Sequence, residues 1–156
     1  MEKKYELTDE MDEVGGHTLY RIRALKDFGN VKKGDLGGFI EKEGNLSHGG
    51  DCWVGDYTRV YDNARVYQNA HISGYAYVYG DAKVYENAWV YSNAEVFGNA
   101  NIYGNARVFG KANVSGNTKI YDKASILGNA KVYGNNCIYG DAQVTGNTEE
   151  SENDSV

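Results

Sequence analysis

The chain carries three histidines, His17, His48 and His71, and histidine is the side chain best suited to acid–base chemistry near neutral pH. A catalytic histidine needs a partner that orients its ring and fixes its protonation state. No Asp or Glu occupies a position expected to stack beside His71, and His48 falls at a repeat position that elsewhere holds an aliphatic residue. We therefore expect structural roles for the histidines rather than catalysis.

The two cysteines, Cys52 and Cys137, lie far apart in the chain and belong to different surfaces in the repeat register described below. This separation predicts two free thiols, which suits a reducing compartment. Cys52 takes a small inward position and Cys137 an isolated outward one, so neither indicates a metal site. The glycines recur at corners and form no nucleotide-binding motif. We expect neither a metal nor a cofactor.

Aromatic side chains offer a different chemistry, that of surface recognition. One series of tyrosines recurs at a constant spacing without interruption: Tyr67, Tyr85, Tyr103, Tyr121 and Tyr139. A second series has the same spacing and mixes aromatic, imidazole and guanidinium groups: Trp53, His71, Trp89 and Arg107. The first predicts a strip for a protein partner or another copy of the chain, and the second a place for a sugar, a nucleobase or a partner's side chain. Both patterns also fit rings that only stabilise neighbouring coils.

The element that would position these side chains is a repeat of six residues. From residue 49 onward, Val or Ile falls at every multiple of six, from Val54 to Val144. Two positions earlier stands a small residue, which is Ala in most repeats. Because residues two apart on a strand share a face, both point to the same side. The position between them varies from Trp to Glu, which indicates solvent, so successive repeats must coil around a shared aliphatic core.

A corner follows each predicted strand. It is usually Gly-Asn or Asp-Asn, as at Gly98 and Asn99 or at Gly104 and Asn105. Gly and Asn tolerate the positive φ that a tight corner in every hexapeptide demands.

Units such as those at 96–101 and 102–107 resemble the hexapeptide repeat of left-handed parallel β-helices, with an aliphatic residue first, often Asn fourth and a small residue fifth. The resemblance spans about residues 44–148. It implies an all-β, single-stranded, left-handed parallel β-helix with three hexapeptides in each coil, so that both aromatic series, which recur at every third hexapeptide, would form columns. The chain departs from the family in one respect, because Tyr or Phe is frequent at the second place, where the family often has Gly.

Three segments are expected. Residues 1–35 lack the repeat and should form an N-terminal β cap, with short strands at 5–7 and 18–24 around a glycine turn. Residues 36–148 should form the β-helix, and the acidic residues 149–156 a disordered tail. The stretches 5–10, 18–28 and 32–46 resemble the leader of uncharacterised hexapeptide-repeat proteins of phages and prophages.

The net charge of −6 is spread unevenly along the chain. Residues 1–48 hold ten acids and eight bases, residues 49–148 hold eight of each, and residues 149–156 hold four acids. A neutral repeat body argues against a nucleic-acid groove and equally against a mimic of DNA. No apolar run of about 18 residues predicts a membrane span, and the charged N-terminus lacks a signal core. We therefore expect a cytoplasmic protein, in the host cytoplasm if a phage encodes it.

Two classes of function remain open. The favoured one is a non-enzymatic binding or scaffold protein that acts through flat aromatic faces, either on a protein partner or by forming a homo-oligomer. The leader resemblance implies an inhibitor of a host protein, such as a defence component. The alternative is an acyltransferase of the hexapeptide-repeat class. That class uses a histidine general base and loops that interrupt the coils, and no loop interrupts residues 49–148.

Overall fold

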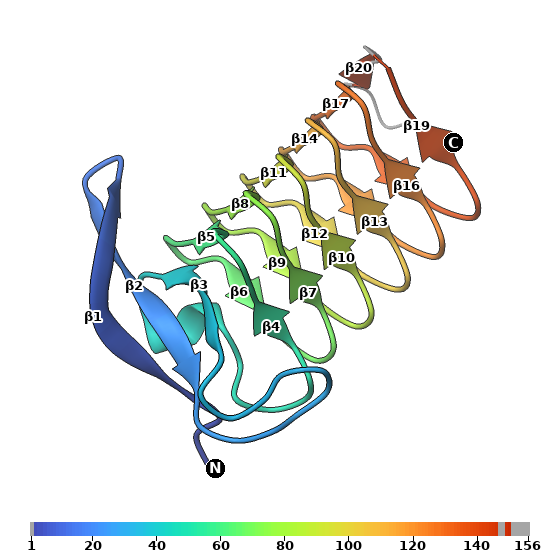
Figure 1. Cartoon of the computed structure of the whole chain (residues 1–156). Helices are drawn as coiled ribbons and strands as arrows, with labels where there is room; N and C mark the ends of the chain where they lie inside the picture. Colours follow the sequence, from blue (N-terminus) through green and yellow to red (C-terminus); the bar gives the residue numbers. More distant parts are fainter. Residues whose placement is uncertain (1, 147–148, 151–156) are drawn as a thin grey trace.

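The six-residue repeat winds into a parallel β-solenoid whose coils stack along one axis (Figure 1). In this computed structural model, residues 2–146 and 149–150 are described. Each hexapeptide contributes a two-residue strand, and the strands stack into three sheets. Trp89 pairs with Arg107 and Val90 with Val108, which confirms the predicted coil of three hexapeptides. Left-handedness stays a prediction from the resemblance.

The strands divide among the sheets as follows. One sheet contains β6 (Arg65–Val66), β9 (Lys83–Val84), β12 (Asn101–Ile102), β15 (Lys119–Ile120) and β18 (Cys137–Ile138). A second contains β4 (Trp53–Val54), β7 (His71–Ile72), β10 (Trp89–Val90), β13 (Arg107–Val108), β16 (Ser125–Ile126) and β19 (Gln143–Val144). The third contains β1 (Tyr5–Val14), β2 (His17–Ala24), β3 (Leu36–Ile40), β5 (Arg59–Val60), β8 (Tyr77–Val78), β11 (Glu95–Val96), β14 (Asn113–Val114), β17 (Lys131–Val132) and β20 (Glu149–Glu150).

The core is the column of aliphatic side chains inside the coils. Every residue at a multiple of six from Val54 to Val144 is at most 3% exposed, which confirms the predicted inward side. The alanines two positions earlier, from Ala64 to Ala130, are fully buried and leave room for the aliphatic neighbours. Each buried Val or Ile contributes roughly 1.5–3 kcal/mol of hydrophobic stabilisation before the entropy cost of ordering it.

The corners differ in one detail from the sequence prediction. The positive φ falls on the first corner residue, such as Gly98 at 65°, and not on the Asn that follows it. At five of the six described corners where this residue is not Gly, its side chain accepts the N–H of the corresponding residue in the next coil. Glu86 Oε1 accepts from Gly104 at 2.9 Å, and Asp122 Oδ2 accepts from Gly140 at 3.0 Å. These hydrogen bonds offset part of the cost of the left-handed backbone and link neighbouring coils.

The first coil is slightly longer than the others. Ile40 pairs with Val60, and Leu46 bridges to Val66. The two residues of each pair are therefore 20 positions apart, whereas three hexapeptides would separate them by 18. Because Trp53 already pairs with His71 at the regular spacing, the extra residues lie between Leu46 and Cys52. The inward position of this coil is therefore held by Leu46, which is fully buried. The sequence assignment of His48 to that position is wrong.

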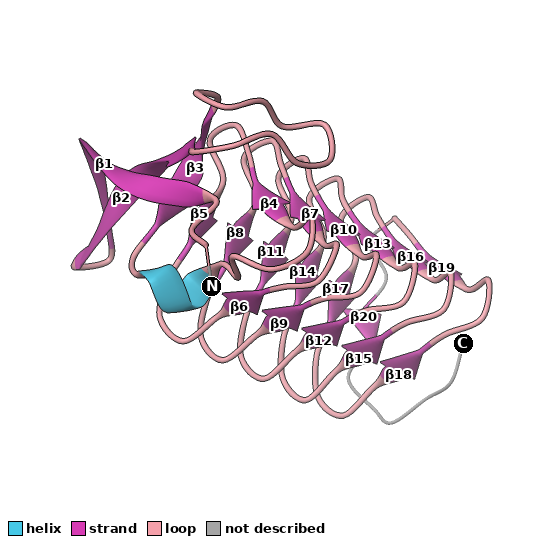
Figure 2. Ribbon diagram, turned by 90° about the horizontal axis from the view of Figure 1, so that it is seen from below, coloured by secondary structure: helices cyan, strands magenta, loops and turns pink. Residues whose placement is uncertain are grey.

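The N-terminal cap is an antiparallel hairpin of β1 and β2, which include the short strands predicted at 5–7 and 18–24. Strand β3 pairs antiparallel with β2 and parallel with β5, so it joins the hairpin to the solenoid. A short 3₁₀ helix, η1 (Glu43–Asn45), follows β3 and lies at the end of the row of strands that begins with β6 (Figure 2). Tyr5 and Ile22 join the main core and close its N-terminal end.

At the other end of the chain, Glu149 and Glu150 lie within the segment predicted to be disordered. They form β20, which pairs with β17. The remaining residues of that predicted tail lie outside the described residues. Within the described part of the chain, no helix is long and apolar enough to cross a membrane.

Candidate functional site

The five regularly spaced tyrosines stack on the outward side of the sheet that begins with β6, which we call the tyrosine face. The ring centroids of successive residues from Tyr67 to Tyr139 are 4.8, 5.0, 5.0 and 5.4 Å apart, and the ring planes deviate by at most 15°. The column arises because each ring follows an inward aliphatic residue whose position recurs with every coil. Its stacking favours neighbouring coils by roughly 0.5–1.5 kcal/mol per pair.

Stacking covers much of the ring faces, so that the rings from Tyr67 to Tyr121 are half-buried. Burial, and then the neighbouring tyrosines, raise the pKa of Tyr85 to about 12, so its hydroxyl is neutral at physiological pH. Tyr139, at the open end of the column, is 37% exposed. The column thus offers an apolar strip with hydroxyl groups that donate and accept hydrogen bonds.

Charged residues flank the tyrosine column on both sides, and the sequence analysis missed them. The basic column, on the strands themselves, contains Arg65, Lys83 and Lys119, with Asn101 between the lysines. On the other side, Glu86 and Asp122 are the corner residues that follow Tyr85 and Tyr121. The sequence contained this pattern of charges. At the spacing of three hexapeptides, the basic residues stand two positions before a tyrosine of the column, and the acidic residues stand one position after it.

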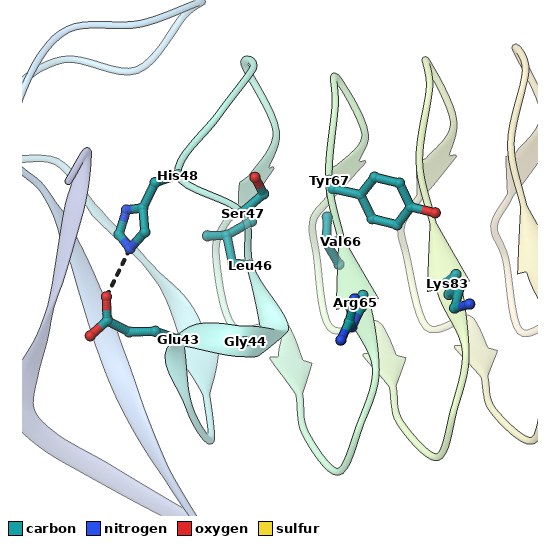
Figure 3. A pocket seen from close by; sticks show the side chains of 9 residues that line it. All are labelled: Glu43, Gly44, Leu46, Ser47, His48, Arg65, Val66, Tyr67 and Lys83. Atoms are coloured by element: carbon teal, nitrogen blue, oxygen red, sulfur yellow. Dashed lines mark hydrogen bonds and ion pairs between the residues drawn. The ribbon is translucent and has the colours of Figure 1, made fainter. Parts of the chain in front are cut away.

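The N-terminal end of the tyrosine face adjoins the cap. A hollow of about 460 Å³ lies there, and Figure 3 shows Arg65, Tyr67 and Lys83 on one side of it and His48 and Glu43 on the other. His48 Nδ1 accepts the backbone N–H of Lys4 at 3.2 Å, so its Nε2 carries the proton directed at Glu43 Oε1, 2.8 Å away. Both ring nitrogens are therefore engaged, and His48 holds the first coil to the cap.

Only part of the second predicted series is exposed on the surface. Trp53, His71, Trp89 and Arg107 pair in register on successive strands, as their spacing predicted. Trp53, however, is only 9% exposed, because Phe28 packs edge-on against it at 5.3 Å. The assignment of Trp53 to a free surface is wrong, since the cap loop folds over it.

The exposed part of this series begins beyond Trp53. Trp89 is 42% exposed, and with Ser73, Tyr91 and Arg107 it lines a hollow of about 240 Å³. Burial lowers the pKa of His71, so its ring is neutral near pH 7. No hydrogen bond to that ring occurs within the described part of the chain, so nothing there orients it as a general base.

His17 is the one histidine that lies between two carboxylates. Its Nδ1 is 2.9 Å from Glu41 Oε2 and its Nε2 is 3.0 Å from Asp62 Oδ1. The three residues could hold a metal ion, because one ligand atom of each lies within 4.8 Å of the others. The contacts to both ring nitrogens instead fit a protonated imidazole that donates to both carboxylates. In that form His17 has no lone pair with which to accept a proton.

The cysteines are free, as predicted. Cys52 is fully buried beside Lys4, whose Nζ lies 3.4 Å from the sulfur and donates to the Cys52 carbonyl at 2.7 Å. Burial raises the pKa of the Cys52 thiol. A protonated, inaccessible thiol is a poor nucleophile, which leaves Cys52 with a packing role.

The fold and its three faces place the chain in the class of repeat β-solenoids, in which three flat sheets enclose a narrow aliphatic core. A family model described as the YdcK beta-solenoid repeat matches residues 59–74 and 100–116. Each matched segment is about one coil long, and the match supports a repeat β-helix assignment. No curated protein matches the chain.

Proposed function

We propose that this protein is a non-enzymatic binding or scaffold protein whose tyrosine face forms a protein–protein contact. The observation that carries the proposal is the column from Tyr67 to Tyr139, which runs over five coils without interruption. Tyrosine is enriched in interfaces because it combines a rigid apolar ring with a hydrogen-bonding hydroxyl. A column held by the backbone ladder loses little side-chain entropy on binding.

The N-terminal cap leaves the tyrosine face more open to a partner than the other two faces. It covers the second sheet at Trp53, against which Phe28 packs. It also covers the third sheet at Tyr61, which is buried in an apolar cluster with Leu19 and Phe39. At the tyrosine face the cap borders an open hollow beside Tyr67, and the rest of the column extends away from it.

The state of the histidines argues against the alternative, an acyltransferase. A general base needs a free lone pair directed at its substrate. In His17 and His48 both ring nitrogens face hydrogen-bonding partners, and within the described part of the chain no carboxylate forms a hydrogen bond with the ring of His71. No loop interrupts the six-residue spacing between Trp53 and Gly146, so the coils offer no slot shaped by an insertion.

The proposed partner is a protein and not a nucleic acid, because residues 49–148 contain equal numbers of acidic and basic side chains. The resemblance of the stretches 5–10, 18–28 and 32–46 to the leader of phage and prophage proteins supports a partner in the host cytoplasm. More specifically, we propose that the protein inhibits a host defence component.

The test compares two double variants that disturb the same kind of ring stack on different faces. Tyr103→Lys with Tyr121→Lys alters the tyrosine face, and Tyr79→Lys with Phe97→Lys alters the equally spaced pair on the third sheet. Tagged chains are used to capture proteins from host lysate and from cells that also make an untagged copy. We expect the tyrosine-face variant to retain at least about 10-fold less bound protein, since central aromatic residues dominate interfaces.

The control variant should retain what the unaltered chain retains. Circular dichroism must show the same β-sheet signal for all three proteins. If both double variants capture equally well, the tyrosines only stack neighbouring coils and the proposed function is wrong.

A further inference from the structure

The charges that flank the tyrosine column are arranged coil by coil. In the coil of Tyr85, Lys83 lies on one side of the ring and Glu86 on the other. The coil of Tyr121 repeats this order, with Lys119 and Asp122. All four charged side chains are exposed, and none forms an ion pair within the described part of the chain. The coil between them carries Asn101 and Gly104 at the same positions and is neutral there.

We propose that the tyrosine face binds a second copy of the chain in parallel, around a two-fold axis that runs along the solenoid. This inference rests on the proposed function and names the partner of the same face. Such an axis places each coil against the same coil of the second copy and exchanges the two sides of the tyrosine column. Lys83 then faces Glu86 of the second copy, and Lys119 faces Asp122 of the second copy. Because of the two-fold symmetry, each of these ion pairs occurs twice in the interface.

The same charges disfavour the opposite orientation. A two-fold axis across the solenoid keeps the sides and reverses the order of the coils. An axis level with Tyr103 would place Lys83 against Lys119 of the second copy, and Glu86 against Asp122 of the second copy. Like charges directly opposed in an interface are unfavourable, so the pattern selects the parallel arrangement.

The remaining coils are compatible with this pairing. Arg65 faces Gln68 of the second copy, whose amide oxygen accepts the N–H of Glu86 at 2.9 Å and has a second lone pair for another donor. Asn101 faces Gly104 of the second copy, where the absence of a side chain lets the two tyrosine columns approach. The hollow beside Tyr67 and His48 marks where the cap borders the face, so the contact centres on Tyr85, Tyr103 and Tyr121.

The size of the strip sets the strength of the dimer. Five coils at about 4.8 Å each give a strip roughly 24 Å tall. Specific stable interfaces bury about 1,200–2,000 Å² in total, and a strip of this height and three residues in width buries less. The dimer is therefore weak and concentration-dependent, and raising the salt concentration weakens it further, because its charged pairs lie at the rim.

Charge exchange tests the pairing. One variant carries Lys83→Glu and Lys119→Glu, and the other carries Glu86→Lys and Asp122→Lys. Gln68 and Glu86 show that a long side chain fits this corner position with positive φ. Sedimentation velocity over a wide concentration range should show dimer formation weakened at least about 10-fold for each variant alone. An equimolar mixture should recover it, because opposite charges then face each other at both coils.

A cysteine substitution tests the orientation. With Cys137→Ser as background, Tyr85→Cys should be linked into a dimer by a short bifunctional thiol reagent that spans the roughly 10 Å between facing sheets, because position 85 faces itself in the parallel arrangement but faces position 121 in the antiparallel arrangement centred on Tyr103. Asn113→Cys, on the third sheet, serves as the control and should stay monomeric. A monomeric unaltered chain at all concentrations, no recovery in the mixture, or equal cross-linking of both cysteine variants would each overturn the proposal.

These outcomes are separate from failure of the proposed function. A chain that stays monomeric but loses another captured protein through Tyr103→Lys and Tyr121→Lys retains the proposed function without the dimer. If those substitutions change neither capture nor self-association, both proposals fail.

Discussion

His17 illustrates how one side chain can join the cap to the solenoid. A neutral imidazole has a single N–H, so it would leave a lone pair against either Glu41 or Asp62. Only the protonated ring satisfies both contacts, and the hydrogen bond to Glu41, reinforced by the charges of Glu41 and Asp62, raises the pKa of His17. Burial and the nearby Lys42 oppose this shift. His17 begins β2, so the charged ring fixes the turn of the hairpin to the first coils.

The protonation of His17 predicts a pH window for the docking of the hairpin. The pKa of His17 is raised above 6.5, so its stabilisation is complete below that pH and is lost as the pH rises through the raised value. Burial alone would raise the pKa of Glu41, but the hydrogen bonds from His17 and Asp62 lower it below 4.5, so its contribution is lost as the pH falls. The hairpin should therefore dock most firmly between these two values.

Hydrogen exchange at residues 14–18, corrected for the intrinsic pH dependence, measures this docking. Protection should fall from about pH 5.5 to about pH 8.5 in the unaltered chain. His17→Gln keeps two hydrogen-bonding atoms but cannot be protonated, so it should show low protection at both pH values. An equal fall in both proteins would mean that His17 is not the titrating group.

At the scale of the elements, the repeat explains which features the sequence could predict. The spacing of three hexapeptides placed Tyr67 to Tyr139 in one column because no insertion separates those coils. It failed at His48, since two extra residues after Leu46 shift the first coil out of the six-residue register. It also failed at Trp53, because a repeat pattern describes one coil at a time and contains no information about a cap loop that folds back over it.

The corners provide a test of how closely neighbouring coils stack. Gly116 and Gly140 both have a positive φ, at 70° and 66°. A Cβ at Gly116 would lie 2.6 Å from the backbone N and O of Gly134, whereas a Cβ at Gly140 would meet nothing within 4 Å. Replacement by Ala incurs the same left-handed backbone strain at both sites, about 1–2 kcal/mol. Gly116→Ala should cost roughly 1–3 kcal/mol more, because the next coil must move.

The free energies of unfolding of the two variants, from urea titration, measure this difference. Gly140→Ala is the matched control, since it isolates the backbone strain from the contact with the next coil. If both substitutions destabilise the chain equally, the coils have room to separate at the corners, and stacking of the backbone does not restrict these positions to Gly.

On the scale of the whole molecule, stability is distributed along the solenoid. In the described part of the solenoid, each strand from β4 to β19 pairs with strands one coil away, so a coil inside the stack has two neighbours and a terminal coil one. Val96 pairs with Val78 and Val114, whereas Val144 pairs, among the described residues, with Ile126 alone. The cap closes the N-terminal end of the core through Tyr5 and Ile22. A defect should therefore have consequences that depend on its distance from the ends.

Introducing a buried charge at two depths tests this directly. Val96 is fully buried and Val144 is 3% exposed, so Asp at either position would lack a partner, at a cost of several kcal/mol. Val96→Asp separates the stack into two parts and should prevent cooperative folding. Val144→Asp can relieve its charge by opening the last coil, and it should keep most of the β-sheet circular dichroism. Hydrogen exchange in Val144→Asp should rise only at amides that donate to the last coil, such as those of Ser125 and Leu127 at β16. If Val144→Asp instead unfolds the whole chain as Val96→Asp does, the coils form one cooperative unit and the terminal coil has no independent stability.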